Sequence, residues 1–302
     1  MKYKKVLVTG GSGFIGSHVA DELSKNGFQV TIYDVKKSKW ILKNQKFIEG
    51  SISDKLLLNK LVEENDYVYH FAGISDLNKA YKNALLTLEY NISSSINLLE
   101  ICANSNVKRF IFASSIYVYS KFGGFYKCSK QAVENYILEY SNIHNLDYTI
   151  LRFGSIYGPR SNDSNGIYRI LKNALLKNKI LYKGSKNSIR EYIHVKDVAK
   201  ASVDILSNEF KNKCVNITGN NKIKVSDLLT IISEIMNIKT IKYSRQKYEG
   251  HYTSTPYTYL PLRGIKYNKN YYYSIEQGLI ELIENLDEEL RWKNKKNFFF
   301  KK

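Results

Sequence analysis

The sequence has 302 residues, of which 43% are hydrophobic, enough for one large α/β domain with or without a small second lobe. It has no run of 18 apolar residues, so no transmembrane helix is expected. The formal net charge is +18, but the lysines are dispersed and no nucleic-acid motif accompanies them, so we expect no nucleic-acid partner and no stable membrane insertion. The scattered cysteines Cys102, Cys128 and Cys214 predict reduced thiols, no metal site and a cytoplasmic setting.

The chain opens with a strand, a glycine-rich turn, a helix, a second strand and an acid. We expect a buried strand over 5–9, a helix over 17–26 and a strand over 28–33. The turn between the first two elements reads Gly10-Gly-Ser-Gly13-Phe-Ile-Gly16. This order of elements is typical of a dinucleotide-binding unit.

Each glycine of this turn has a separate role in such a unit. Gly10 permits the tight turn, Gly13 lets a pyrophosphate approach the helix N-terminus, and Gly16 lets the helix pack closely on the strand. Asp34 follows the second strand, where a carboxylate accepts both ribose hydroxyls of NAD and repels the extra phosphate of NADP. The turn therefore predicts NAD as the cofactor.

Strands and helices continue to alternate as far as Arg152. We expect strands over 47–48, 66–71, 108–113 and 147–152, and helices over 55–63, 80–105 and 124–142. This alternation predicts a parallel, doubly wound sheet, in which ligands bind at the carboxyl ends of the strands. The residues expected at that edge are Gly10, Asp34, Gly73, Ser115 and Phe153.

Beyond Arg152 the pattern is looser and predicts a smaller α/β lobe. The expected helices cover 166–177, 195–206, 225–236 and 274–284, and the expected strands cover 189–193 and 215–217. We assign residues 1–160 to the dinucleotide-binding domain, which also receives parts of 189–217, and residues 161–302 mainly to the second lobe.

Tyr126 and Lys130 form a pair with the chemistry of a proton donor. Their spacing of four places both side chains on one face of a helix. The ammonium is expected to lower the pKa of the phenol, and the Ser115 hydroxyl is placed to share the proton path. The pair suits removal of a proton from an alcohol while a hydride leaves the same carbon. The spacing could also arise by chance in a chain with 25 tyrosines.

Four motifs in order give a family resemblance. They are the glycine turn, the Ser115, Tyr126 and Lys130 set, Leu151-Arg-Phe-Gly-Ser-Ile-Tyr-Gly-Pro-Arg160 and Arg190-Glu-Tyr-Ile-His-Val-Lys-Asp197. Together they resemble the extended short-chain dehydrogenase/reductases and, more narrowly, the NAD-dependent epimerase/dehydratase family that acts on nucleotide sugars. The resemblance implies a Rossmann sheet with a C-terminal substrate lobe.

The resemblance also implies roles for individual residues. Tyr126 would be the catalytic acid/base, assisted by Lys130 and Ser115. The implied cofactor contacts are Gly10, Gly13, Phe14, Ile15, Gly16, Asp34, Ile52, Phe71, Ala72, Gly73, Asn91, Tyr126, Lys130 and Phe153. The implied substrate contacts are Ser115, Tyr117, Ser155, Asn165, Arg190 and Tyr192. Arg190 would meet the sugar-nucleotide diphosphate. The alternatives are an ordinary ion pair for Arg190 and turn caps for Ser155 and Asn165.

Departures from the family pattern narrow the reaction. The family's 4,6-dehydratases carry Asp-Glu directly after the catalytic Thr, and its UDP-glucuronate decarboxylases carry Glu at the second of these places. Here the two places hold Ile116 and Tyr117. We therefore expect a nucleotide-sugar 4-epimerase that works through a 4-keto sugar. A nucleotide-sugar dehydrogenase or 4-keto reductase, and a non-catalytic binding protein, remain as alternatives.

Two further expectations follow from the resemblance. Only residues 120–125 separate Tyr119 from Tyr126, a shorter loop than in relatives, and we expect residues 250–261 to close the sugar pocket instead. The helices over 80–105 and 124–142 are expected to pair across a homodimer. A role in making polysaccharide precursors is an expectation from the family.

Overall fold

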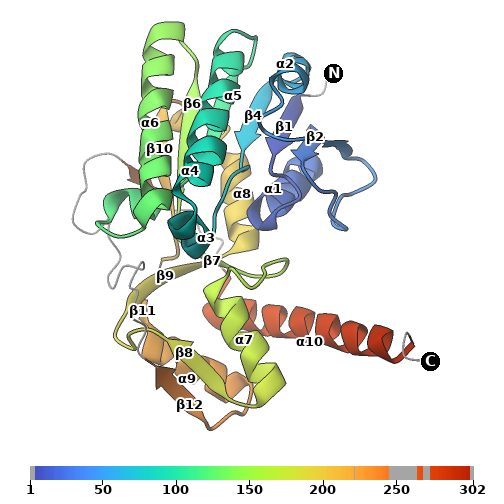
Figure 1. Ribbon diagram of the computed structural model, residues 1–302, viewed down its shortest axis with the longest axis vertical. Helices are drawn as coiled ribbons and strands as arrows, with labels where there is room; N and C mark the ends of the chain where they lie inside the picture. The colour runs from blue at the N-terminus through green and yellow to red at the C-terminus, as the bar shows by residue number, and fades with distance from the viewer. Residues whose placement is uncertain (1–3, 221, 245–263, 268–272, 300–302) are drawn as a thin grey trace.

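The computed structural model describes residues 4–220, 222–244, 264–267 and 273–299. The expected sugar-pocket segment over 250–261 lies outside the described residues. The chain forms a large part built on one sheet and a smaller part below it, from which helix α10 (Ile275–Phe299) extends outward (Figure 1). Among the described residues, no helix has the length and apolar character that a membrane crossing requires.

The large part is organised around an eight-stranded sheet in the order β13-β10-β6-β5-β4-β1-β2-β3. Every strand pair in it is parallel. The predicted doubly wound Rossmann architecture is therefore confirmed. The strands are β1 (Lys5–Thr9), β2 (Gln29–Asp34), β3 (Lys46–Glu49), β4 (Tyr67–His70), β5 (Arg109–Ser115), β6 (Tyr148–Phe153), β10 (Lys213–Ile217) and β13 (Ile265–Lys266).

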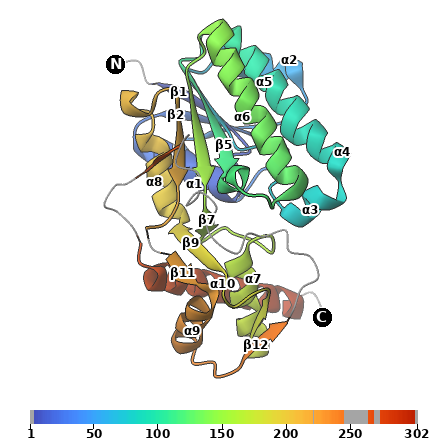
Figure 2. The same cartoon turned by 90° about the vertical axis from the view of Figure 1, so that its left-hand side faces the viewer.

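Helices cover both faces of this sheet, as Figure 2 shows. Residues alternate along each strand, so Val6 and Val8 pack under one helical layer and Leu7 under the other. The first layer is α1 (Phe14–Lys25) and α8 (Val195–Asp204), and the second is α2 (Lys55–Glu63), α5 (Ser94–Ala103) and α6 (Gly124–His144). Two apolar cores result, and they hold the carboxyl ends of the strands at one fixed edge.

The single helix predicted over 80–105 is wrong. The segment is divided into α3 (Leu77–Lys82), α4 (Ala84–Thr87), the π-helical turn η1 (Leu88–Ser93) and α5. The first break is at Asn83, which leaves helical geometry (φ −134°, ψ 70°) and donates its side-chain amide to the carbonyl of Lys79. The π-helical turn carries Asn91, whose side chain bonds outside the helix. Such turns are frequent at functional sites.

The smaller lobe has its own core around Leu171, Leu228 and Leu282. It contains α7 (Gly166–Lys177), α9 (Val225–Ile235) and α10, with a two-stranded sheet of β8 (Ile180–Lys183) and β12 (Ile241–Ser244) that the pattern did not predict. A three-stranded sheet of β7 (Ser155–Tyr157), β9 (Ile189–His194) and β11 (Lys222–Lys224) lies between the lobes in Figure 1. The short 3-10 helices are η2 (Ile116–Tyr119) and η3 (Asn208–Phe210). The exact domain boundary near residue 160 stays a prediction.

Candidate functional site

Tyr126 and Ser115 meet at the carboxyl edge of the large sheet. Ser115 is the last residue of β5 and is 6% exposed, and Tyr126 lies in the first turn of α6. Their side chains are hydrogen bonded. The ring of Tyr117 packs edge-on against the ring of Tyr126 at a centroid distance of 6.3 Å. The phenol is thus held by one hydroxyl partner and one aromatic wall, in the place that the sequence predicts for proton transfer.

Lys130 lies one turn further along α6 and is buried. Its Nζ donates to the carbonyl oxygen of Ala113 at 2.8 Å. The same ammonium is 5.8 Å from the centroid of the Tyr126 ring and 4.7 Å from that of Phe112. The helical spacing therefore does place Tyr126 and Lys130 on one face, as predicted.

The expected direction of the Tyr126 pKa needs correction. Desolvation raises the pKa of Tyr126 to about 12, and the hydrogen bond from Ser115 opposes this rise without cancelling it. Desolvation also lowers the pKa of Lys130 to about 8, against the attraction of Glu134, which raises it. The expected lowering of the Tyr126 pKa is therefore wrong, because desolvation is the largest cause of the shift at both residues. The extent of burial is set by tertiary packing, which the spacing of the two residues does not reveal.

The glycine turn has the shape of a phosphate cradle. Gly10 adopts φ +71°, and a Cβ there would lie 2.5 Å from the backbone nitrogen of Ala72. A Cβ on Gly16 would lie 2.4 Å from the carbonyl oxygen of Gly10. The helix α1 begins after Gly13 with no side-chain cap and no acid in its first turn, and the buried Ser12 Oγ has no partner among the described residues. These features fit an anionic cofactor group at the helix N-terminus.

Asp34 closes the other side of this turn at the end of β2. Its Oδ2 accepts from the backbone N–H of Ser12 at 3.0 Å, and its Oδ1 accepts from that of Lys36 at 3.4 Å. Burial raises the pKa of the carboxyl, while these N–H donors lower it. The carboxylate is therefore fixed beside the glycine turn, where the sequence analysis predicts that it accepts hydrogen bonds from the ribose hydroxyls.

The side chain of Asn91 binds the backbone of the loop that follows β4, at the edge of the sheet predicted to bind the cofactor. Its Oδ1 accepts from Ile74 N–H at 2.6 Å, and its Nδ2 donates to the Ile74 carbonyl at 2.9 Å and to Ser129 Oγ at 3.1 Å. Gly73 adopts φ +141°, and a Cβ there would lie 2.8 Å from Asn91 Oδ1. Asn91 thus ties the loop after β4 to the helix that carries Tyr126.

Most of the remaining predicted cofactor residues pack in or against the two cores beside this edge. Phe71 stacks on Phe153 at a centroid distance of 6.3 Å, and Phe14 packs edge-on against His18. Ile15 packs against the core on the α1 side, and Ile52 and Ala72 belong to the core on the α5 side. Their contacts with a cofactor stay a prediction.

Apart from Ser115 and Tyr117, the predicted substrate residues lie on the sheet between the lobes and at the start of α7. Ser155 of β7 and Tyr192 of β9 are register partners. Arg190 is 9% exposed and donates to the carbonyl of Ile189 at 3.0 Å. Asn165 caps α7, since its Oδ1 accepts from Tyr168 N–H at 3.2 Å. The cap that the sequence offered as an alternative for Asn165 is present, and a sugar-nucleotide contact by these residues stays a prediction.

A buried ion pair next to Lys130 was not predicted. Glu134 of α6 and Arg152 of β6 pair at 2.6 Å, with side chains only 8% and 7% exposed. The available signal was the spacing of four between Lys130 and Glu134, which puts them on one helical face.

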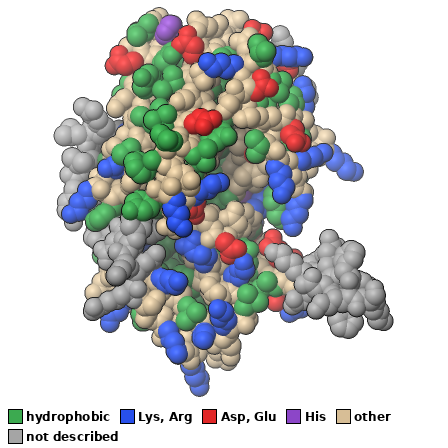
Figure 3. Space-filling model, in the orientation of Figure 1, with side chains coloured by type: hydrophobic (Ala, Val, Ile, Leu, Met, Phe, Trp, Pro, Cys, Tyr) green, Lys and Arg blue, Asp and Glu red, His purple; other side chains and the backbone are tan. Residues whose placement is uncertain are grey.

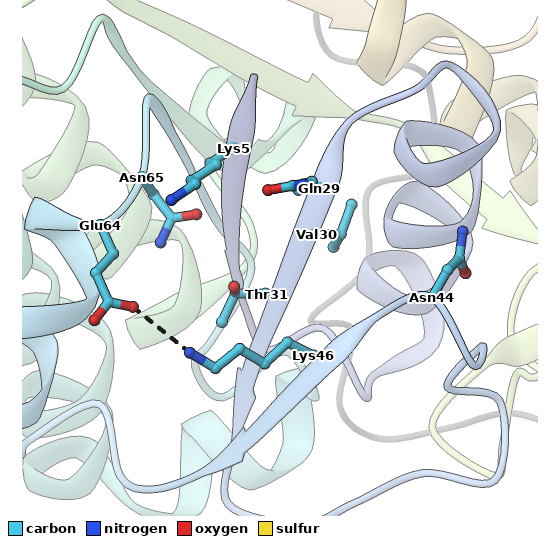
Figure 4. Close-up of a pocket in the computed structure, with 8 residues that line it drawn as sticks. All are labelled: Lys5, Gln29, Val30, Thr31, Asn44, Lys46, Glu64 and Asn65. Atoms are coloured by element: carbon cyan, nitrogen blue, oxygen red, sulfur yellow. Dashed lines mark ion pairs between the residues drawn. The ribbon is translucent and has the colours of Figure 1, made fainter. Parts of the chain in front are cut away.

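A polar cavity of about 290 Å³ lies at the amino ends of the strands, away from Tyr126. Figure 4 shows its lining, including the ion pair between Lys46 and Glu64 at 3.6 Å. Lys5, Gln29 and Lys46 are the first residues of β1, β2 and β3, so the cavity occupies the edge opposite the one that binds ligands in such sheets. Among the described residues, no cluster of His, Cys, Asp and Glu could hold a metal ion.

Comparison with known proteins identifies the family of the chain. The model of the NAD dependent epimerase/dehydratase family matches residues 6–218. A putative UDP-glucose 4-epimerase of Methanocaldococcus jannaschii is 31% identical over 253 residues, covering 75% of this chain and 81% of that protein. A UDP-N-acetyl-alpha-D-glucosaminuronate decarboxylase of Bacillus cytotoxicus is 30% identical over 259 residues, covering 77% and 80%. The crystal structure of UDP-glucose 4-epimerase from Thermotoga maritima with UDP-glucose is similar with a TM-score of 0.81 at 25% identity, covering 95% of this chain and 99% of that one.

Proposed function

The chain belongs to the NAD-dependent epimerase/dehydratase family, and from this premise we propose that it is a nucleotide-sugar 4-epimerase. NAD, when bound, supplies a reversible hydride acceptor. The chain's own residues supply the proton chemistry. Tyr126 takes the proton of the sugar 4-hydroxyl and gives it back after the 4-keto sugar has turned over. Ser115 orients the Tyr126 phenol for this transfer through the hydrogen bond between the two side chains.

The cofactor would be held by groups that the structure already orients. The glycine turn and the start of α1 fit the diphosphate, and Asp34 fits the ribose hydroxyls. Lys130 would carry the positive charge below Tyr126, which favours the tyrosinate needed for proton abstraction.

The observation that carries the choice of reaction is the contact between Tyr117 and Tyr126. Dehydratases and decarboxylases of the family resembled here place a carboxylate at the position of Tyr117. In this chain that position holds an aromatic ring packed against the catalytic phenol. One similar protein is a decarboxylase. The tyrosine at position 117, in place of a carboxylate, therefore favours 4-epimerisation over decarboxylation for this chain. Tyr117 can provide a wall for a sugar ring, but it cannot act as a carboxylate acid or base.

The nucleotide that we propose is UDP. The relatives described above are named for UDP-sugars. Arg190, Ser155, Tyr192 and Asn165 are the candidate contacts for this substrate, because they come from the sheet between the lobes and the adjoining start of α7.

An absorbance titration tests this function. The freshly purified protein is mixed with UDP-glucose, UDP-galactose, UDP-N-acetylglucosamine or UDP-glucuronate, and the band of reduced nicotinamide is recorded while products are separated. We expect interconversion of one sugar pair without net reduction of added NAD. Accumulation of an oxidised sugar with stoichiometric reduction of added NAD would replace this proposal with a dehydrogenase.

We also propose that the protein is a cytoplasmic homodimer that makes precursors of polysaccharides. Apolar side chains are exposed on the helices of one face, among them Leu85 (82%), Ile143 (69%), Tyr81 (52%) and Leu88 (51%). Figure 3 shows hydrophobic side chains over the region where Figure 1 places α4, α5 and α6. A second copy would cover them. The free cysteines support a reducing compartment.

A further inference from the structure

The ion pair between Glu134 and Arg152 connects the catalytic helix to the sheet. Arg152 Nη2 donates to Glu134 Oε2 at 2.6 Å, and Arg152 Nε donates to Glu134 Oε1 at 3.0 Å. This is a two-point contact between a guanidinium and a carboxylate, and both side chains are more than nine-tenths buried. The orientation of the Glu134 carboxylate is therefore fixed from the sheet side.

A second set of contacts extends from this pair to the end of β5. Ser114 Oγ donates to Glu134 Oε1 at 2.5 Å, and Ser114 immediately precedes the catalytic Ser115. On the other side, the Tyr119 hydroxyl is hydrogen bonded to Arg152 and donates to Asn216 Oδ1 at 3.1 Å. One carboxylate thus touches the strand that carries Ser115 and belongs to the helix that carries Tyr126 and Lys130.

Stability alone does not account for this arrangement. A buried ion pair loses much of its attraction to the cost of desolvating two charges, and an apolar pair of similar volume often serves as well. The position of the Glu134 carboxylate relative to Lys130 indicates a second role. Glu134 lies one turn beyond Lys130 on α6. Desolvation lowers the pKa of Lys130, and the negative charge of Glu134 raises it.

Among the described residues, Glu134 is the one charged group whose attraction raises the pKa of Lys130. From β5, the Ala113 carbonyl accepts its hydrogen bond and the Phe112 ring lies 4.7 Å from its Nζ. From β4, His70 is buried, and burial together with the Lys130 charge lowers the pKa of His70 to about 3, so it is neutral. From α6 itself, Tyr126 is protonated.

We infer that Glu134 is a positioning residue whose carboxylate, clamped by Arg152 and Ser114, keeps Lys130 protonated and aligned beside Tyr126. It acts through Lys130 and touches neither the substrate nor the cofactor. The inference about Lys130 concerns the chain alone, and its consequence for catalysis rests on the proposed function.

The direct test is the titration of Lys130 in the full-length protein without added ligand. The protein is labelled with lysine carrying carbon-13 at Cε, and the resonance of Lys130 is assigned by its disappearance in Lys130→Met. We expect Glu134→Gln to lower the pKa of Lys130 by about one unit, because it removes the opposite charge and keeps the volume. Glu134→Asp keeps the charge and is expected to leave this pKa near the wild-type value.

A matched control separates this effect from general loosening of the fold. Asp21→Asn breaks the ion pair between Asp21 and Arg160, which is also a largely buried contact between an arginine and a carboxylate at 2.7 Å, and should leave the pKa of Lys130 unchanged. If Glu134→Gln does not fold, Glu134→Ala, which removes the carboxylate and leaves Arg152 in place, should lower the pKa of Lys130 in the same direction. An unchanged Lys130 pKa in whichever of these two variants folds would overturn the inference, as would equal shifts in Glu134→Gln and Glu134→Asp.

The catalytic consequence is measured with UDP-galactose as the probe. In Glu134→Gln, the alkaline limb of the pH profile of kcat/KM should move to lower pH by the shift seen for Lys130, because neutral Lys130 no longer favours the tyrosinate. Absence of epimerisation of all four UDP-sugars by the wild-type protein would refute the proposed function, while the titration would still decide the role of Glu134. A moved Lys130 pKa with an unmoved alkaline limb would overturn the catalytic part alone.

Discussion

Lys130 Nζ donates to the carbonyl oxygen of Ala113 at 2.8 Å, and this bond joins the catalytic helix α6 to the end of β5. The two residues are 17 positions apart in the chain, and the contact fixes the Lys130 ammonium, whose Nζ lies 5.8 Å from the centroid of the Tyr126 ring. The phenol of Tyr126, which we propose exchanges a proton with the sugar, is hydrogen bonded to Ser115.

Removal of the Tyr126 hydroxyl should abolish most turnover. Tyr126→Phe keeps the ring that packs against Tyr117 and deletes only the proton donor. We expect kcat to fall by about 10²–10⁴-fold, the range for loss of a general acid/base, with the affinity for NAD largely unchanged. Steady-state kinetics with calorimetric titration of NAD measures both. Cys128→Ser, an exposed change two residues further along α6, is the control and should keep wild-type turnover; wild-type rates in Tyr126→Phe would refute the assignment.

Asp34 should determine the preference for NAD over NADP. In Asp34→Asn the ribose hydroxyls lose a charged acceptor, and the repulsion of an added phosphate is gone. We expect NAD affinity to fall about tenfold, which corresponds to the loss of a hydrogen bond to a charged group, while NADP affinity rises or stays constant. Glu49→Gln removes the exposed carboxylate at the register position next to Asp34 and serves as the control. Equal losses in the two variants would show that Asp34 has no specific part in cofactor choice.

Acid should destabilise the fold through three buried histidines. Desolvation lowers the pKa of His70 to about 3 and those of His18 and His194 to about 4, all below the ordinary value of 6.5. Between pH 6.5 and 4 the unfolded chain therefore binds protons that the folded chain does not, so stability falls as pH falls. Asp197, whose pKa burial raises to about 6, opposes part of this loss.

Thermal unfolding followed from pH 7 downward measures this effect. His70→Gln should make the decline of Tm shallower, because one of the three proton-binding groups of the unfolded chain is removed. A Tm that stays constant down to pH 4, or an identical slope in His70→Gln, would contradict the account.

The exposed face of α4 and α6 should mediate dimer formation. Leu85→Glu places a charge on a side chain that is 82% exposed in one copy and would be buried by a second. We expect this variant to be monomeric by light scattering at micromolar concentration, where the wild type is dimeric. Leu56 of α2 is similarly exposed (88%), so the control variant Leu56→Glu should remain dimeric. A monomeric wild type would refute the proposed assembly.

Local patterns were sufficient to predict the geometry of the glycine turn and of the Tyr126–Lys130 pair. The glycine turn and Asp34 are close in sequence, and the spacing of Tyr126 and Lys130 is set by the helix itself. These features follow from backbone geometry within a few turns of chain.

Long-range packing set what could not be predicted. The pairing of β8 with β12 joins segments about 60 residues apart, and the pKa of Tyr126 is controlled by burial. The break at Asn83 depends on a side chain bonding its own backbone, a choice that helix periodicity does not reveal. The sequence pattern places Arg152 in a strand but does not reveal its ion pair with Glu134, because that contact depends on the packing of α6 on the sheet.

The most direct test of the proposed reaction follows deuterium placed on carbon 4 of UDP-galactose. The full-length enzyme with its bound cofactor converts the labelled sugar, and the product is examined by mass spectrometry and NMR in the presence of excess unlabelled NAD. The account predicts UDP-glucose that keeps the deuterium on carbon 4, because the hydride returns to the same sugar from the opposite face. An oxidised sugar with deuterium transferred to the added NAD would contradict epimerisation and establish net redox chemistry at Tyr126.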